Sequence, residues 1–141
     1  MLPNEEIDRI VKAQESAVRL KDIDGAMKHY SPDVVSFDVV STLQKRGIKT
    51  CRERLESWLA QFPEPFSYHI ETLSITADEE VAFCHSFNHV LGDLANGNRI
   101  DMRWRATTCF SRMNGKWLIT HEHSSVPFDP ETGMAIIKGD A

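Results

Sequence analysis

The residues best suited to chemistry gather in the last predicted strand, which spans Lys116 to Val126. Alternate side chains of a strand share one face, so His121, His123 and Ser125 are expected to point the same way. An apolar start followed by two imidazoles and a hydroxyl is typical of a pocket wall that becomes polar toward one end. Glu122 points away from both histidines and is expected at the solvent or at an interface.

The neighbouring strand faces these histidines in one of two ways, depending on the turn at Asn114-Gly115. A two-residue turn places beside them Trp104, Ala106, Thr108 and Phe110. A three-residue turn with Gly115 in a bulge places there instead Arg103, Arg105, Thr107 and Cys109. We favour the three-residue turn, because it gathers a polar patch and leaves Trp104 and Phe110 for an opposite face that could be a subunit interface. An inward arginine would offer a planar fork to a carboxylate or enolate, and a surface salt bridge is the alternative.

Metal-binding patterns are incomplete in this sequence. His85 and His89 share a face of another predicted strand, and imidazole is a good zinc ligand. No cysteine or carboxylate spacing completes a site, so we expect hydrogen-bonded pocket or core histidines, with no metal and no cofactor. The three cysteines lack a CxxC pair and are expected to be small buried apolar residues.

The elements that must position these residues are indicated by the spacing of apolar residues, which changes along the chain. Helical periodicity comes first, over about 3–20, 23–30 and 48–62. A short strand is expected over 34–40, after Ser31-Pro32-Asp33 ends the second helix. Long alternating strands follow over 66–75, 81–91, 99–112 and 116–126. The first of these changes phase near Glu71-Thr72, which predicts a bulge. This order predicts an α+β fold, with helices packed on one face of a curved sheet.

Length and composition describe an ordinary globular protein. The 141 residues are 41% hydrophobic and 26% charged, which fits a single domain over residues 1–141. A net charge of −5 argues against nucleic acid as a partner, because backbone binding needs clustered Lys and Arg. No apolar run approaches the roughly 20 residues that span a membrane, and the acidic start differs from a signal peptide. We therefore expect a soluble cytoplasmic protein that binds neither nucleic acid nor membrane.

The last strand also carries a family pattern. The residues W-x-I-x-H-x-H-x-S-x-P, here Trp117 to Pro127, resemble the end of SnoaL-like domains of the ketosteroid-isomerase-like (nuclear transport factor two-like) superfamily. They are also similar to the association domain of calcium/calmodulin-dependent kinase II. Weaker pieces lie upstream in the expected order, at Arg105–Thr107, Arg46-Gly47 and Asp22–Gly25. The resemblance implies a homodimer and a cone-shaped fold, with three N-terminal helices on a strongly curved, mainly antiparallel sheet.

The resemblance also implies a general base. In ketosteroid isomerases an aspartate at the place of Asp38 removes a proton next to a carbonyl, which needs a pocket that raises its pKa. A solvent-facing or hydrogen-bonded aspartate is the structural alternative. The acid pair of those enzymes has no counterpart here, because Gln14 stands where their tyrosine would align and Thr107, Thr108 and Cys109 where their second aspartate would fall. Steroid isomerisation by that mechanism is not expected.

Two hypotheses of function remain open. In the first, the chain is a cofactor-independent isomerase, cyclase, lyase or hydrolase with Asp38 and His123 as its catalytic acid–base pair. Its unknown small-molecule substrate would then contact His121, Arg105, Thr107, Ser125 and Trp58. In the second, the chain is a non-catalytic ligand-binding or assembly dimer, because one scaffold can host both uses.

Overall fold

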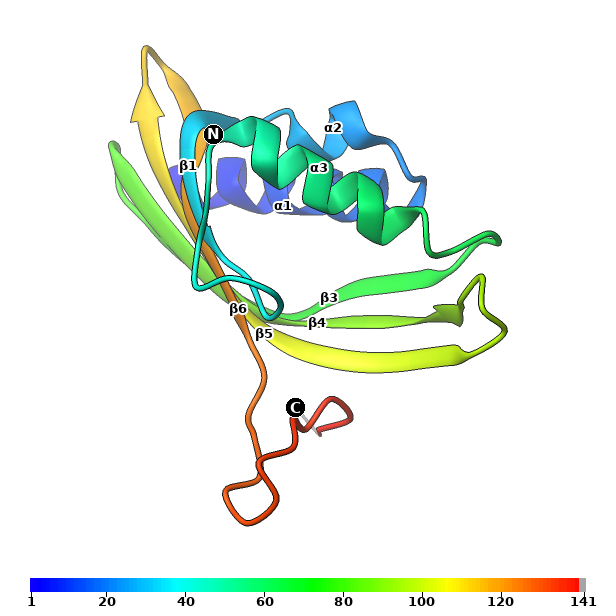
Figure 1. Ribbon diagram of the computed structural model, residues 1–141. Coiled ribbons are helices and arrows are strands. Elements are labelled where there is room, and N and C mark those ends of the chain that lie inside the picture. Colours follow the sequence, from blue (N-terminus) through cyan, green and yellow to red (C-terminus); the bar gives the residue numbers. More distant parts are fainter. Residues whose placement is uncertain (140–141) are drawn as a thin grey trace.

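The computed structural model describes residues 1–139 (Figure 1). Three helices, α1 (Pro3–Arg19), α2 (Ile23–Met27) and α3 (Ile48–Leu59), lie on one side of a six-stranded sheet. The strands are β1 (Tyr30–Phe37), β2 (Lys45–Arg46), β3 (Ser67–Ala77), β4 (Val81–Asp93), β5 (Arg99–Met113) and β6 (Lys116–Ser125). Their order is β2-β1-β6-β5-β4-β3, and only the pair of β1 and β6 is parallel. The sheet curves around the helices, which confirms the predicted α+β cone fold.

The helices follow the apolar stripes of the sequence. Helix α1 begins at Pro3 and buries Ile7, Val11 and Val18 along the face that meets the sheet. Asp22 caps α2, because its Oδ1 accepts a 3.0 Å hydrogen bond from the backbone N–H of Gly25. None of the helices within residues 1–139 has the length and apolar character needed to cross a membrane.

The first strand begins earlier than predicted. β1 starts at Tyr30 and includes Ser31-Pro32-Asp33, where a break was expected. The pairing of β1 with β6 is interrupted between Tyr30 and Val35, so no bond of that ladder needs the N–H that Pro32 lacks. The strand ends at Phe37, which leaves Asp38 on the loop that follows.

The bulge predicted in β3 is confirmed. The register between β3 and β4 shifts between Glu71 and Ser74, and Thr72 has a left-handed φ of 55°. The apolar phase of β3 changes at this point, so Tyr68 before it and Ile75 after it both pack on the helical side of the sheet.

The turn between β5 and β6 is shorter than the favoured prediction. Met113 pairs with Lys116, so Asn114 and Gly115 form a two-residue turn, with φ values of 51° and 77°. Two positive φ angles match the right-handed twist of a hairpin and suit Asn-Gly. The predicted three-residue turn is therefore wrong.

Candidate functional site

A cavity of about 620 Å³ lies between the helices and the concave face of the sheet. This volume falls in the range of small-molecule sites in proteins. All three helices, five of the strands and the loop after β1 contribute to its wall. The polar side chains on that wall include Gln14, Tyr30, Ser36, Asp38, Arg54 and Glu122.

Glu122 of β6 points into this cavity. Its Oε2 accepts a 2.5 Å hydrogen bond from the hydroxyl of Tyr30, and its Oε1 accepts one of 3.1 Å from Ser36. Gln14 of α1 donates to the same tyrosine hydroxyl at 3.3 Å. Helix α1 and strand β1 together fix the carboxylate, and the prediction that Glu122 faces solvent or an interface is wrong.

A bulge in β6 turns Glu122 inward. The register between β5 and β6 shifts between Cys109 and Phe110, which makes Thr120 an extra residue in β6. Side chains alternate on either side of the bulge. The residue that points inward is therefore Ile119 before the bulge and Glu122 after it. The chemistry of the cavity therefore depends on one inserted residue.

Burial raises the pKa of Glu122 above the ordinary value of a glutamate, because the ionised carboxylate loses its hydration. Hydrogen bonds from Tyr30 and Ser36 lower this pKa, and the nearby charge of Asp38 raises it. Burial also raises the pKa of Tyr30 well above its usual value, so its hydroxyl stays protonated as the donor. A carboxyl group with a raised pKa suits proton exchange closer to neutral pH.

Asp38 also borders the cavity, but both of its oxygens have partners. Its Oδ2 lies 2.9 Å from Nε of Arg54 on α3 and 3.7 Å from Nζ of Lys45 on β2. Its Oδ1 accepts a 2.6 Å hydrogen bond from the N–H of Val39. The aspartate therefore ties the loop after β1 to α3 and β2.

Aromatic side chains form another part of the wall. Trp58, Tyr68 and Trp104 all border the cavity, with ring centroids 6.0 to 6.1 Å apart. Trp58 lies nearly perpendicular to Trp104, at 88°. The hydroxyl of Tyr68 accepts a 3.0 Å hydrogen bond from Asn88, which fixes the ring. The cavity thus combines an aromatic wall with a hydrogen-bonded carboxylate.

Three of the predicted site residues border the cavity, namely Asp38, Trp58 and Thr107, although Thr107 is exposed and pairs with His123 of the outer face. The other four are absent from its wall and lie on the outer face of the sheet: His121, His123, Arg105 and Ser125. The expected strand pairing is present, with Thr107 opposite His123 and Arg105 opposite Ser125. The bulge in β6 produces this pairing in place of the longer turn.

The predicted catalytic pair is not assembled. Within residues 1–139, Asp38 makes no hydrogen bond or ion pair with either histidine of β6. Nδ1 of His121 lies 2.7 Å from the carbonyl oxygen of Val35, and both imidazoles pack edge-on against Phe37, at 4.6 and 5.4 Å. His121 and His123 are therefore held by β1 on the outer face.

Trp104 and Phe110 were expected on the face away from the pocket. The structure reverses this prediction, because Trp104 borders the cavity and Phe110 is 2% exposed in the core. Strand β5 pairs with β6 in the expected register. However, the face of β5 that carries Trp104 and Phe110 is the concave face of the sheet. A subunit interface on that face is excluded by the helices that cover it.

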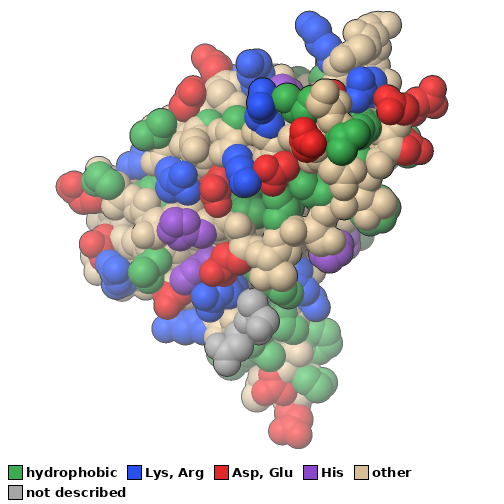
Figure 2. Space-filling model, turned by 180° about the vertical axis from the view of Figure 1, so that it is seen from behind, with side chains coloured by type: hydrophobic (Ala, Val, Ile, Leu, Met, Phe, Trp, Pro, Cys, Tyr) green, Lys and Arg blue, Asp and Glu red, His purple; other side chains and the backbone are tan. Residues whose placement is uncertain are grey.

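The back of the molecule carries charged side chains of both signs, histidines and some hydrophobic side chains. Figure 2 shows histidine side chains there among side chains of both signs. Nε2 of His89 lies 2.6 Å from Asp101, and Nε of Arg103 donates to Glu71 at 2.9 Å. Among residues 1–139, no three His, Cys, Asp or Glu side chains lie together as a set that could hold a metal ion.

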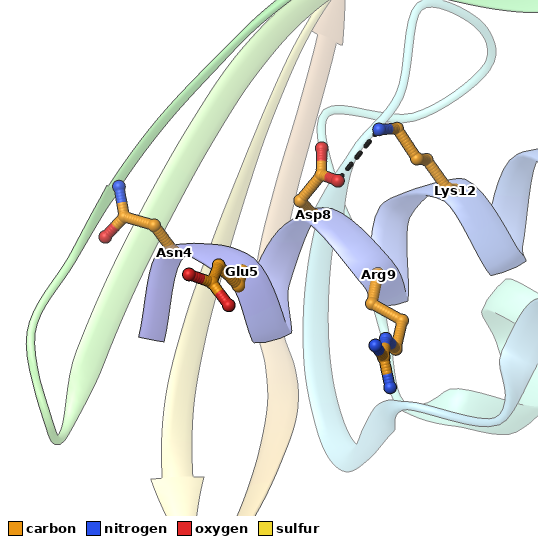
Figure 3. A pocket seen from close by; sticks show the side chains of 5 residues that line it. All are labelled: Asn4, Glu5, Asp8, Arg9 and Lys12. Atoms are coloured by element: carbon orange, nitrogen blue, oxygen red, sulfur yellow. Dashed lines mark ion pairs between the residues drawn. The ribbon is translucent and has the colours of Figure 1, made fainter. Parts of the chain in front are cut away.

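A second hollow of about 450 Å³ runs along the exposed face of α1 (Figure 3). Its lining residues are Asn4, Glu5, Asp8, Arg9 and Lys12, and an ion pair of 2.8 Å joins Asp8 to Lys12. A single helix supplies all of them, so no side chains converge on a ligand from opposite sides. The cavity beneath the helices is the better candidate site.

Comparison with known proteins adds to this picture. A family model of SnoaL-like domains matches residues 7–129. The chain belongs to this family. No curated protein is similar enough to this SnoaL-like chain to count as a match.

Solved structures share the fold of this SnoaL-like domain. An NTF2-like protein of unknown function from Pseudomonas putida is 28% identical, with a TM-score of 0.88 over 98% of this chain and 96% of that one. A proposed dehydratase of the NTF2-like family from Streptomyces avermitilis is 14% identical, with a TM-score of 0.72 over 86% of this chain and 93% of that one. The association domain of C. elegans CaMKII is 15% identical, with a TM-score of 0.69 over the same shares.

Two further residues of the cavity were not singled out from the sequence, and the signals for them are weak. Arg54 follows Cys51 by three positions and precedes Trp58 by four, so it lies beside the apolar stripe of α3. A charged residue at that position indicates a polar group facing the interior. Tyr30 was assigned to the end of α2, and nothing in its surroundings indicated that it would reach Glu122 from a strand.

Proposed function

We propose that this SnoaL-like domain binds a small organic molecule in its cavity and catalyses a cofactor-independent proton transfer on it, as an isomerase or lyase. Glu122 is the group that exchanges the proton. The observation that carries the proposal is a half-buried carboxylate, hydrogen-bonded by Tyr30 and Ser36, on the wall of a 620 Å³ cavity. Such a group can take a proton from a carbon next to a carbonyl.

The balance of the reaction needs no external reagent. The proton that Glu122 removes returns to another carbon in an isomerisation, or leaves with the expelled group in an elimination. Tyr30 keeps the carboxylate oriented through its 2.5 Å hydrogen bond. Asp38 has a positioning role, because its ion pair of 2.9 Å holds the guanidinium of Arg54 beside the cavity. In this proposal Glu122 takes the place of the Asp38–His123 pair.

A specific observation favours self-association. The segment after β6 exposes large apolar side chains, with Phe128 64% and Met134 69% exposed. Exposed apolar side chains gathered in one segment are typical of contact surfaces. We propose a homodimer on this basis, and light scattering of the purified protein checks it. A cytoplasmic location stays a prediction from the sequence.

Hydrogen–deuterium exchange tests the catalytic proposal. The protein would be incubated in D₂O with cyclic ketones, β-hydroxyketones and β-aminoketones, and the exchange of α-protons followed by ¹H NMR. Glu122→Gln keeps the shape of the side chain and should slow the exchange by about 100-fold or more. Glu79→Gln, on the exposed turn between β3 and β4, is the matched control and should leave the rate unchanged. Equal rates in wild type and E122Q would contradict the role of Glu122, and binding without exchange would favour the non-catalytic alternative.

A further inference from the structure

The charges around the cavity are not balanced. Asp38 has two cationic partners, Arg54 at 2.9 Å and Lys45 at 3.7 Å. Glu122 receives hydrogen bonds only from the neutral hydroxyls of Tyr30 and Ser36, and within residues 1–139 it forms no ion pair. A half-buried carboxylate without a cationic partner is unfavourable when ionised, and a bound cation would relieve that cost.

The aromatic wall favours the same kind of ligand. The rings of Trp58, Tyr68 and Trp104 border the cavity at different angles, 71° between the first two and 88° between the two tryptophans. Differently oriented aromatic rings can present their electron-rich faces to one cation from several sides, as in sites for quaternary ammonium groups. Glu122 and these three rings border the same cavity, so carboxylate and rings serve one ligand volume.

We propose that the cavity selects an organic cation, an amine or quaternary ammonium attached to an apolar ring. Glu122 is its counter-charge, and Trp58, Tyr68 and Trp104 surround its apolar part. An anion would be repelled by the carboxylate of Glu122, and a neutral ligand would leave that carboxylate without a cationic partner. The inference rests on the proposed function only in taking the cavity as a ligand site, and holds whether or not the ligand is turned over.

Calorimetric titration with three matched probes tests the inference. Benzyltrimethylammonium supplies the cation, neopentylbenzene is its neutral isostere, and phenylacetate is an anion with the same ring. We expect the cation to bind on the order of 30-fold more tightly than the isostere, and phenylacetate to bind most weakly. E122Q should reduce the preference for the cation to about threefold while binding the isostere as the wild type does. Glu79→Gln should keep the full preference.

The pH dependence supplies a second readout. The titratable groups that interact with Glu122 are Asp38, His121, Tyr30, Tyr68 and Cys51. Because burial raises the pKa of Glu122, affinity for the cation should increase as pH rises through that pKa, whereas affinity for the isostere should not increase. Circular dichroism of E122Q checks that the variant folds, and Trp104→Leu should weaken cation binding independently of Glu122.

The outcomes separate the two proposals. Equal or tighter binding of neopentylbenzene, or a cation preference that survives in E122Q, overturns the inference and leaves the proposed ligand site standing. Binding of none of the three probes overturns the inference and also counts against the cavity as a ligand site. Selective cation binding without proton exchange supports the inference and contradicts the catalytic part of the proposed function.

Discussion

Tyr30→Phe should lower the free energy of unfolding more at pH 8 than at pH 4.5. The substitution removes the hydroxyl that donates to Oε2 of Glu122 at 2.5 Å and leaves the ring in place. A hydrogen bond to an ionised group is worth about 1.5–3 kcal/mol, and one between neutral groups about 0.5–1.5 kcal/mol. We expect a loss in unfolding free energy of about 2 kcal/mol where Glu122 is ionised and about 1 kcal/mol where it is protonated, so the loss should be larger at pH 8 than at pH 4.5.

The direction of this pH dependence of the unfolding free energy follows from proton linkage. Burial raises the pKa of Glu122 in the folded state, so the folded protein binds more protons than the unfolded chain between the two pKa values. Stability from this group is therefore highest at low pH and falls as pH rises through the folded pKa. Tyr30 lowers that pKa through its hydrogen bond, and its removal makes the fall larger.

Urea denaturation at the two pH values measures the effect. Tyr68→Phe is the matched control, because its hydroxyl accepts a hydrogen bond from the neutral amide of Asn88, so its cost should change less with pH than that of Y30F. The double variant Y30F/E122Q should show a cost for Y30F that no longer changes with pH. A cost for Y30F that is equal at both pH values, or smaller at pH 8, would refute the reasoning.

Four further changes probe other parts of the structure. Gly92→Ala should lower the unfolding free energy by about 1–3 kcal/mol in urea, because its Cβ would lie 2.8 Å from Cβ of Phe66. Gly115→Ala should cost about 1 kcal/mol in the same assay, because the residue has a φ of 77°. His123→Ala should leave ligand affinity and proton exchange within about twofold of wild type, because the side chain lies outside the cavity. Lys45→Met should speed amide exchange in loop 38–44 about fivefold, because it removes the contact with Asp38 and a 3.2 Å bond to a loop carbonyl.

Each of these four predictions has an outcome that would contradict it. An unchanged midpoint in Gly92→Ala would mean that Phe66 moves aside freely, and an unchanged midpoint in Gly115→Ala would mean that the turn adopts another type. A large loss of proton exchange in His123→Ala would place that imidazole in the reaction despite its outward direction. Equal amide exchange in Lys45→Met would show that the loop is held by other contacts.

The bulge in β3 could be predicted because apolar residues lie on both sides of it. Tyr68 and Ile70 set one phase, Leu73 and Ile75 set the other, and only an extra residue reconciles them. The fold as a whole could be predicted from the order of periodicities and from the family pattern at the end of the chain. Both signals can be read from the sequence because the fold requires particular residue types at these positions.

The bulge in β6 could not be predicted from the same kind of signal. Beyond Thr120 both phases of the strand are polar, with His121 and His123 on one face and Glu122 and Ser124 on the other. Alternation continued from Ile119 leads to the histidines as the inward residues. The pairing with β5 decides which face of this half-strand points inward. Tyr30 and Ser36 favour the same face, because they supply hydrogen-bond donors to Glu122 alone.

The extra residue in β6 has a consequence for how such a domain can diverge. Loss of Thr120 would leave the helices, the turn and the first half of the strand untouched, and would exchange the two faces of the second half. A carboxylate on the cavity wall would then be replaced by two imidazoles in a single genetic event. On this scaffold a change in the polar groups of the cavity does not need a series of substitutions, because an insertion or deletion of one codon brings a complete alternative set of side chains to the cavity wall.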